Sequence, residues 1–396
     1  MIKKISLRNW KSFEESEFYI DSLSFLIGTN ASGKSNLLEA FAFVSNLAKG
    51  KNIDDAIELV RGDGDWVIRK GQESFIIEVI VGYPDYTGEY EYKLLVAKNE
   101  DSTFRISAES LMALEAPEKG NRRLFLSNSG EGLVIAMDED KVDDSQGNIN
   151  VVNAKQSLLS QVELLPLVQP IKDEISRFAN ELKSIFLLST APSEMRGYKK
   201  ASTELKPDAS NLAPVLVSLP EDRKLEIEAL LTEYLRPLPE KDIKQVWALP
   251  VGLQQKDGIL CCKEEWIDGE EIDIDSAEMS DGTLRFIAIV ASLLLRPEHS
   301  LIAIEEVDNG LHPSRAALLV NVLRQIGAKR NIDIICTTHN PTLIDALGVE
   351  MIPFISYVSR DRRSGCSRID LLEEKKDIVR LMSMGTVGDL MVNSKI

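Results

Sequence analysis

The chain has 396 residues, 44% of them hydrophobic, and a formal net charge of −17 at pH 7. This composition is typical of a globular protein with a substantial core, and the length allows two domains or one large composite domain. No run of 18 apolar residues occurs, and the start, Met1–Lys4, lacks the apolar stretch of a signal peptide. We therefore expect no membrane span and no membrane partner, and we predict a cytoplasmic protein.

Charged residues and cysteines limit the ligands further. The net negative charge opposes binding of nucleic acid over the whole surface, because such binding depends on neutralising phosphates, so DNA is an open but not an indicated partner. The four cysteines lack CxxC spacing, which argues against a zinc site or a disulfide framework. Two local basic clusters could contact DNA, although solvated loop charges are the simpler interpretation: Arg196, Lys199 and Lys200, and Arg360, Arg362 and Arg363.

The first strands lead to a glycine-rich loop. Partial alternation over residues 2–8 predicts a strand, and residues 9–13 form a polar turn with two aromatic side chains. An apolar strand over residues 23–27 then enters Gly28–Ser35, which fits the pattern GxxxxGK[ST] and which we name the phosphate loop. The helix that follows has apolar residues at three- and four-residue steps, so one face packs on a sheet.

The order of strand, glycine-rich loop and helix predicts a nucleotide site. Backbone N–H groups of such a turn, together with a helix N-terminus, form a concave positive cage that fits a polyphosphate. Lys34 would reach the β- and γ-phosphates and the Ser35 hydroxyl would bind Mg²⁺. The alternative is a Gly/Ser turn that merely starts a helix. The predicted nucleotide contacts are Asn30, Ala31, Ser32, Gly33, Lys34, Ser35 and Asn36.

The middle of the chain changes its hydrophobic period twice. A period of two over residues 75–81, 89–94, 103–108 and 132–137 predicts an antiparallel β subdomain, followed by an acidic surface loop at 138–150. Helical periodicity over 156–186 and 211–235 predicts a helical insert. We therefore divide the chain into an N-terminal lobe (1–155), the helical insert (156–245) and a C-terminal lobe (246–396).

The C-terminal lobe returns to α/β order. A buried strand over residues 301–304 ends in Glu305 and Glu306, and the next buried strand, over 332–336, is followed by Thr337, Thr338 and His339. Helices are expected at 286–295 and 314–326, between and beside these strands. Open α/β sheets place their ligands at such strand ends, so the fold class is α/β.

Two carboxylates at the end of an apolar strand suit phosphoryl transfer with Mg²⁺. Glu305 would hold the ion through its water shell, and Glu306 would polarise the attacking water. His339 could hydrogen-bond the γ-phosphate or that water. The alternatives are a solvent-facing acidic strand end and a structural histidine. Ser280–Gly282 precedes a helix as an ordinary N-cap or as an anion site for a nucleotide on another subunit.

Together these motifs resemble the ABC-class ATPases of the SMC/RecF/OLD type. The resemblance is carried by the phosphate loop with Asn36 and by residues 7–13, 280–285, 304–313 and 338–340, and it is greatest with the stand-alone ATPases called AAA_21, which residues 208–213 also resemble. It implies an ABC-type ATPase head: a P-loop NTPase core sheet with an antiparallel β subdomain, plus a helical insert. ATP and Mg²⁺ are the implied cofactors.

The resemblance also implies partners. In that family the serine and glycine of the signature loop, here residues 279–285, contact the γ-phosphate held by a partner, so Ser280 and Gly282 would take these roles in a head-to-tail homodimer or higher oligomer. Relatives usually have aspartate at the position of Glu305, and another aspartate near 310–312. Gln156 and Gln161 are candidates for the Q-loop glutamine. Residues 340–396 are too few for the TOPRIM domain of OLD nucleases, so we expect any nuclease to be a separate chain.

These features favour one function over two others. We expect a Mg²⁺-dependent ATPase head that dimerises on ATP and controls a separately encoded effector, such as a nuclease or toxin, in anti-phage defence. A RecF-like DNA-repair ATPase and an ATP-binding scaffold with negligible turnover are the alternatives.

Overall fold

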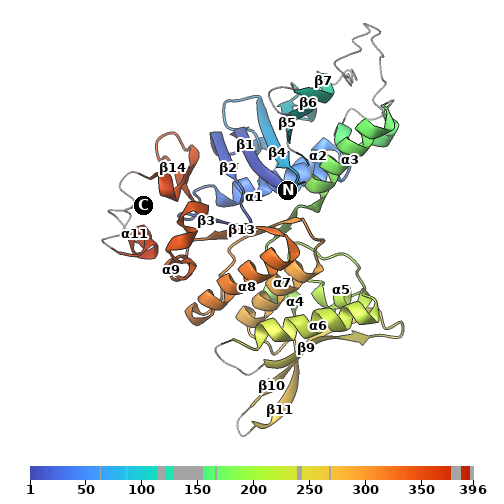
Figure 1. Cartoon of the computed structure of the whole chain (residues 1–396), viewed down its shortest axis with the longest axis vertical. Coiled ribbons are helices and arrows are strands. Elements are labelled where there is room, and N and C mark those ends of the chain that lie inside the picture. The colour runs from blue at the N-terminus through green and yellow to red at the C-terminus, as the bar shows by residue number, and fades with distance from the viewer. Residues whose placement is uncertain are drawn as a thin grey trace. The chain divides into compact units, whose positions relative to one another are not determined.

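The computed structural model describes the whole chain except residues 63, 85, 87, 115–120, 129–154, 166, 239–242, 267–268, 376–384 and 393–396. The strand expected at 132–137 and the loop expected at 138–150 lie outside the described residues. Contacts group the chain into two units, each built from separate segments (Figure 1). Unit 1 holds residues 1–21, 28–185 and 356–370, and unit 2 holds residues 22–27, 186–355 and 371–396. The division into 1–155, 156–245 and 246–396 stays a prediction.

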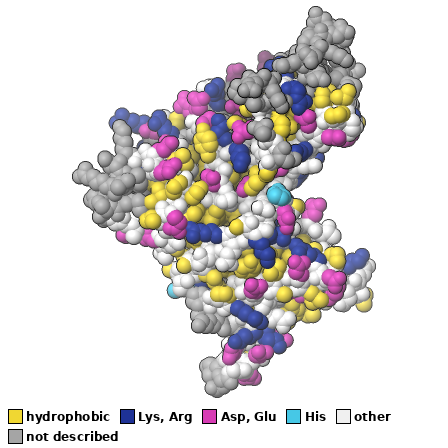
Figure 2. Space-filling view, viewed as in Figure 1, with side chains coloured by type: hydrophobic (Ala, Val, Ile, Leu, Met, Phe, Trp, Pro, Cys, Tyr) yellow, Lys and Arg dark blue, Asp and Glu magenta, His cyan; other side chains and the backbone are white. Residues whose placement is uncertain are grey.

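The described surface is mixed in charge. On the face drawn in Figure 2, basic side chains lie among acidic ones, and no broad basic area is seen on that face. None of the described helices has the length and apolar character needed to cross a bilayer.

Unit 1 is built mainly on antiparallel strands. In spatial order its strands are β7 (Arg122–Asn128), β6 (Phe104–Leu114), β5 (Glu89–Lys98), β4 (Ser74–Gly82), β1 (Ile2–Trp10), β2 (Phe13–Tyr19), β15 (Ser367–Leu371) and β14 (Ile355–Arg360). Neighbours from β7 to β2 are antiparallel, whereas β15 is parallel to β2. Burial along β4 and β5 alternates, and Val79 faces Tyr92 across the pair. One face of these strands therefore enters the core, as the period of two predicts. The strands expected at 75–81, 89–94 and 103–108 are confirmed, and β2 was not expected.

Helices cover the strands of unit 1. They are α1 (Lys34–Ala48), α2 (Ile53–Glu58) and α3 (Gln169–Ser184), with the short turns η1 (Gly64–Trp66), η2 (Leu158–Ser160) and η3 (Val162–Leu164). Trp10 of β1 packs on Phe43 of α1 at 5.3 Å between ring centroids and on Phe75 at 5.0 Å. The helix expected from residue 156 begins later, at α3, whose first turn contains a proline. Proline suits this position because the first helical N–H groups have no intrahelical partner.

Unit 2 contains short parallel strands. Their order is β3 (Leu23–Ile27), β13 (Asp333–Thr338), β12 (Leu301–Ile304) and β8 (Phe186–Leu188). The residues of β3, β12 and β13 are all buried, which is typical of parallel strands covered on both faces. The accompanying helices are α4 (Pro192–Met195), α7 (Asp281–Leu295), α8 (Ala316–Arg330), α9 (Pro341–Leu347) and α11 (Val387–Val392), with the turns η5 (Pro313–Arg315), η6 (Val349–Phe354) and η7 (Leu372–Glu374).

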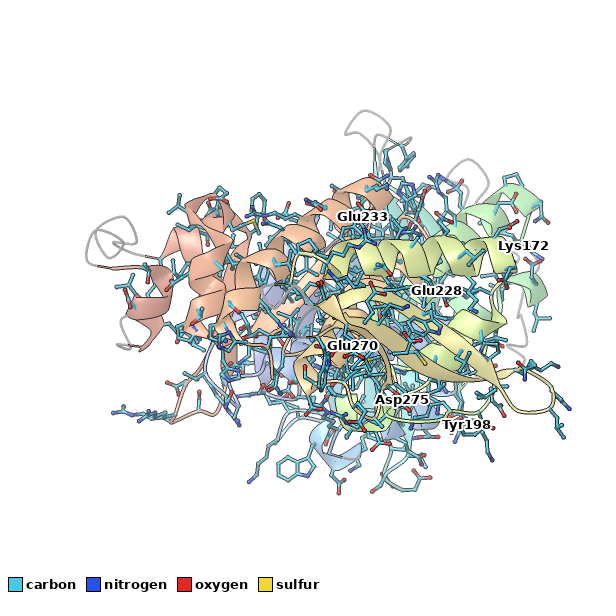
Figure 3. All side chains as sticks on the ribbon, turned by 90° about the horizontal axis from the view of Figure 1, so that it is seen from below. Lys172, Tyr198, Glu228, Glu233, Glu270 and Asp275 are labelled. Carbon is cyan, nitrogen blue, oxygen red and sulfur yellow. The ribbon has the colours of Figure 1, made fainter. Side chains whose placement is uncertain are left out.

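A second, three-stranded sheet in unit 2 was not expected. It consists of β11 (Glu271–Asp275), β10 (Asp257–Glu265) and β9 (Ile243–Val251), and α5 (Leu212–Ser218) and α6 (Glu221–Leu235) pack on β9 and β10 (Figure 3). Glu228 of α6 accepts a hydrogen bond from the Ala248 N–H at 2.8 Å, and Thr232 accepts one from the Val246 N–H at 3.0 Å. The two helices confirm the helical periodicity at 211–235.

Candidate active site

The phosphate loop has a backbone that only small residues permit. Gly28, Ala31 and Gly33 have φ values of +151°, +60° and +120°. A Cβ on Gly28 would lie 2.3 Å from the Val358 carbonyl oxygen, and one on Gly33 would lie 2.6 Å from Ser367 Oγ. Both glycines are therefore required by positive φ and by close approach, as the pattern predicts.

Residues from both ends of the chain support this loop. Trp10 Nε1 donates to the Asn36 carbonyl oxygen at 2.7 Å, and Asn36 Nδ2 donates to Ser12 Oγ at 2.8 Å. Ser367 Oγ donates to the Ser32 carbonyl oxygen at 2.6 Å and lies 2.7 Å from Ser12 Oγ. The opening motif thus holds the loop and the start of α1, and Ser367 of β15 is a supporting residue that no sequence pattern indicated.

The predicted phosphate contacts gather at the start of α1. Lys34 is buried, and its ammonium donates to the carbonyl oxygens of Gly28 at 2.8 Å and Thr29 at 2.9 Å. The N-cap of α1 is Gly33, and no side chain caps the helix. Ser35 is half-buried on the first turn, whereas Asn30 and Ala31 are exposed. Within the described residues, the buried Ser32 Oγ has no hydrogen-bond partner.

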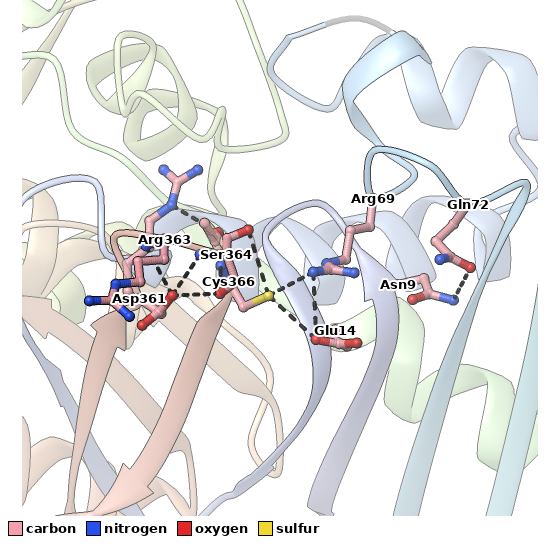
Figure 4. Close-up of polar contacts among 10 residues, drawn as sticks. Asn9, Glu14, Arg69, Gln72, Asp361, Arg363, Ser364 and Cys366 are labelled. Atoms are coloured by element: carbon pink, nitrogen blue, oxygen red, sulfur yellow. Dashed lines mark hydrogen bonds and ion pairs between the residues drawn. The ribbon is translucent and has the colours of Figure 1, made fainter.

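A tight turn joins β14 and β15 (Figure 4). The Asp361 carboxylate accepts hydrogen bonds from the N–H groups of Arg363 and Ser364 at 3.0 and 2.6 Å, which fixes the turn. Arg360 reaches the Ala31 carbonyl oxygen at 3.5 Å. Nearby, Arg69 Nη2 lies 2.7 Å from Cys366 Sγ and forms an ion pair with Glu14 at 3.5 Å.

The two carboxylates after β12 have different surroundings in unit 2. Glu305 is 8% exposed, and its Oε2 accepts a hydrogen bond from Ser189 Oγ at 2.9 Å. Glu306 has φ +47°, which is uncommon for a residue with a side chain. Its N–H donates to Thr337 Oγ1 at 2.8 Å, and its Oε2 accepts from Asn309 Nδ2 at 3.1 Å. Strained backbone of this kind clusters at functional sites, so it supports a role for Glu306.

A buried arginine joins the helix of the signature loop to this strand end. Arg285 of α7 donates to the carbonyl oxygens of Glu306 at 3.3 Å and Thr190 at 3.4 Å. Burial lowers the pKa of its guanidinium, and the carboxylates of Glu306, Asp308 and Asp281 oppose that shift. Because an arginine stays protonated in proteins, Arg285 places a buried positive charge behind Glu306.

The signature loop begins α7 in the same unit. Ser280 is the N-cap: its Oγ accepts a hydrogen bond from the Thr283 N–H at 3.1 Å and lies 2.9 Å from Thr283 Oγ1. A Cβ on Gly282 would lie 2.9 Å from the Gly310 carbonyl oxygen, so glycine is required here. The ordinary N-cap is thus present within one chain. A contact with a partner's nucleotide stays a prediction.

Most of the chain matches the model of a known protein family. The model of the AAA_21 family, described as "AAA domain, putative AbiEii toxin, Type IV TA system", matches residues 23–345. The chain belongs to the AAA_21 family. This AAA_21 protein is also 38% identical over 72 residues to the DNA replication and repair protein RecF of Bacillus thuringiensis (strain Al Hakam), and equally so to RecF of Bacillus cereus (strain B4264). Those matches cover 18% of this chain and 19% of each RecF, so the chain spans about a fifth of the length of these curated relatives.

A solved structure supports the same fold. The crystal structure of the SmcHead bound to the C-winged helix domain of ScpA is similar to this chain, with a TM-score of 0.54 and 15% sequence identity. The match covers 93% of this chain and 96% of that chain. The predicted fold class and the resemblance to the SMC/RecF type are therefore confirmed. The AAA_21 protein therefore shares the fold of an SMC head domain.

The donor groups of the phosphate loop fit the nucleotide that this family implies. An ammonium, a buried hydroxyl without a partner among the described residues, and a helix start without a side-chain cap are suited to phosphate oxygens. Among the described residues, no group of three or more His, Cys, Asp or Glu side chains could hold a metal ion. The roles of Ser35 and Glu305 as Mg²⁺ ligands stay predictions.

The remaining predicted residues lie at different places. His339 is exposed directly after β13, in unit 2. Gln156 Nε2 donates to the Gly50 carbonyl oxygen at 2.7 Å, and Gln161 Nε2 donates to the Gln156 carbonyl oxygen at 3.1 Å, both in unit 1. The Q-loop assignment stays a prediction, as does every catalytic and nucleotide-binding role given above.

Proposed function

We propose that this AAA_21 protein binds ATP at the phosphate loop and hydrolyses it with Mg²⁺. The main support for ATP hydrolysis is the strained backbone of Glu306, which follows a buried strand. Lys34 and the N–H groups at the start of α1 hold the phosphates, and Ser35 and Glu305 hold the ion. When bound, Mg²⁺ would supply positive charge to offset that of the phosphate oxygens. Glu306 polarises the attacking water, and His339 hydrogen-bonds the γ-phosphate.

We propose further that two copies associate head to tail on ATP. Ser280 supports this, because its hydroxyl can cap α7 as an acceptor and still donate its own O–H. If Thr283 Oγ1 donates to Ser280 Oγ and accepts from Arg315, whose Nη1 lies 3.4 Å away, the Ser280 O–H is able to donate to a phosphate. That phosphate would belong to the nucleotide of the other copy.

A mixing experiment tests the composite site. Ser280→Arg puts a bulky cation at the start of α7, so it should abolish hydrolysis while ATP binding, measured by calorimetry, stays near wild type. Lys34→Ala should also be inactive. Equal amounts of the two variants should recover about a quarter of the wild-type rate, because half of the dimers then contain one intact site. Ser218→Arg, at an exposed serine that ends α5, is the matched control and should behave as wild type.

Three outcomes would contradict these proposals. Full activity of Ser280→Arg would mean that the signature loop is an ordinary helix cap. Absence of recovery, with heterodimers shown by native mass spectrometry, would rule out an independent composite site. ATP binding without measurable turnover in the wild type would favour a scaffold over an ATPase head.

We also propose that the head controls a separately encoded effector, such as a nuclease or toxin, in anti-phage defence in the cytoplasm. The family's description, which names a toxin and a toxin–antitoxin system, supports this. Cells carrying the gene with its neighbours should resist phage, and Glu306→Gln should remove that resistance. Equal plaque counts with and without the genes would refute the role.

The similarity to RecF favours a second candidate, a DNA-repair ATPase. Anisotropy of a labelled DNA duplex should rise on addition of protein and ATP if this is correct, and the rise should weaken with salt. The net charge of −17 opposes this candidate. On the face drawn in Figure 2, basic side chains are mixed with acidic ones.

A further inference from the structure

Arg196, just after α4 in unit 2, holds the segment that leads into α7. Its Nη1 lies within hydrogen-bond distance of three carbonyl oxygens, those of Ser276 (3.2 Å), Ala277 (2.7 Å) and Met279 (2.8 Å). Its Nη2 donates to the Asp281 carboxylate at 2.5 Å. The guanidinium thus contacts residues on both sides of Ser280.

A second contact strengthens this connection. The Gly197 N–H donates to Ser276 Oγ at 2.9 Å, and Ser276 is fully buried. Arg196 and Gly197 therefore hold the turn before the signature loop at two points. Among side chains, a guanidinium suits this arrangement best, because its planar fork presents five fixed N–H donors. A lysine has three donors on a flexible stem and would reach fewer of these acceptors in one geometry.

The contacts of Arg196 also argue against a role for this residue in DNA binding. Arg196 belongs to one of the two basic clusters considered as DNA contacts, together with Lys199 and Lys200. Its guanidinium is instead engaged by carbonyl oxygens and by Asp281. A charge held in this way is poorly placed to neutralise a DNA phosphate, so Arg196 has an internal role.

The chain just before Arg196 contacts the predicted catalytic strand end. Ser189 Oγ donates to Glu305 Oε2 at 2.9 Å, and the Thr190 carbonyl oxygen accepts from Arg285 at 3.4 Å. The stretch 189–196 therefore touches the predicted Mg²⁺ carboxylate at one end and the signature loop at the other. Both ends lie within unit 2.

We propose that Arg196 is a positioning residue of the signature loop. It contacts no nucleotide in this scheme: it fixes the backbone before Ser280 and the carboxylate after it, so that Ser280 and Gly282 meet the partner's nucleotide in one geometry. This role presupposes the head-to-tail dimer proposed above.

The test uses full-length Arg196→Ala and Arg196→Lys. In Arg196→Ala the turnover should fall about tenfold or more, the change expected from losing one hydrogen bond to a charged group. ATP affinity by calorimetry should stay within about twofold of wild type. Arg196→Lys should be intermediate because it can keep the Asp281 contact. Arg223→Ala is the matched control, since Arg223 also has one carboxylate partner, Glu226 at 2.6 Å, and one carbonyl partner, and it should keep full turnover.

Complementation separates positioning from general damage. Arg196→Ala mixed with Lys34→Ala should recover activity, because one composite site then holds an intact signature loop and an intact phosphate loop. Arg196→Ala mixed with Ser280→Arg should not recover, because both changes damage the signature side. If Arg196→Ala instead disrupted the fold of the whole subunit, neither mixture would recover activity.

The outcomes also separate this proposal from the proposed function. If Ser280→Arg and Lys34→Ala recover together but Arg196→Ala and Lys34→Ala do not, the role of Arg196 is refuted and the composite site stands. If the first pair fails although heterodimers form, the independent composite site of the proposed function is refuted, and with it the basis for the role of Arg196. If Arg196→Ala does not fold, as judged by circular dichroism, Arg196→Lys and Asp281→Asn replace it. Wild-type turnover in both of these would overturn the proposal.

Discussion

The helices α1 and α7 have the same length, 15 residues, and each begins at a predicted phosphate contact, but their first turns differ. The first turn of α1 has no acidic residue and no side-chain cap. In contrast, α7 has Ser280 as a hydrogen-bonded cap and Asp281 in its first turn. A cap contributes about 1 kcal/mol to helix stability, and an acidic group near the N-terminus adds about 0.3–1 kcal/mol.

We infer that the phosphate loop and the signature loop bind a nucleotide in different ways. No side chain of the protein caps the N–H groups at the start of α1, so these groups are available to donate hydrogen bonds to a phosphate. We therefore expect a single copy to bind ATP. The start of α7 is already stabilised by Ser280 and Asp281, so a phosphate would bind there with a smaller gain in free energy. We expect α7 to contact a nucleotide only when a second copy holds it in place.

The largest expected effect concerns α1. Lys34→Ala should lower ATP affinity about 100-fold or more, because two hydrogen bonds from a charged group, each of about 1.5–3 kcal/mol, are lost. Calorimetry with ATP measures this change. Lys51→Ala, an exposed lysine shortly after the same helix, should bind as wild type. Unchanged affinity of Lys34→Ala would remove the distinction between the two helices.

The next effect separates binding at α1 from chemistry in unit 2. Glu306→Gln should keep ATP affinity but lower turnover about 100-fold or more, since the amide cannot polarise water and general bases contribute about 10²–10⁴-fold. Phosphate release measures the rate. Glu298→Gln, at an exposed position, is the control. If Glu306→Gln hydrolyses at the wild-type rate, the base lies elsewhere, with Glu305 the next candidate.

A smaller effect tests the cap of α7 directly. Ser280→Ala should lower the free energy of unfolding by about 1 kcal/mol, because the Thr283 N–H loses its acceptor. Ser32→Ala, just before α1, removes a hydroxyl that has no hydrogen-bond partner among the described residues, so it should change the free energy of unfolding by much less. Urea unfolding curves compare the two. Equal losses would mean that both helix starts are stabilised in the same way.

The smallest effect concerns the charge beside that cap. Asp281→Asn should cost about 0.5 kcal/mol, because the helix-dipole interaction and the half-exposed ion pair with Arg196 are both weakened by solvent. The loss should shrink as salt increases. A loss that is independent of salt would show that the carboxylate acts through geometry alone.

Features that depend on residues close together in the sequence could be predicted, whereas contacts between residues far apart in the sequence could not. The phosphate loop, the alternating strands of unit 1 and the strand before Glu305 were predictable, because each depends on neighbouring residues. Ser367 was not, because its partner Ser32 is 335 residues away. The sheet of β9, β10 and β11 was missed because acidic residues and Pro250 interrupt the apolar pattern, and β8 because three residues are too short to show a period.

The interleaved chain of unit 1 has a consequence for synthesis on the ribosome. The phosphate loop is made early, but Ser367, which holds its Ser32 carbonyl oxygen, belongs to the segment 356–370 that completes unit 1. A nascent chain that ends before this segment has the loop without one of its supports. We therefore expect truncated products to bind ATP poorly, so that only a nearly finished polypeptide acquires a nucleotide.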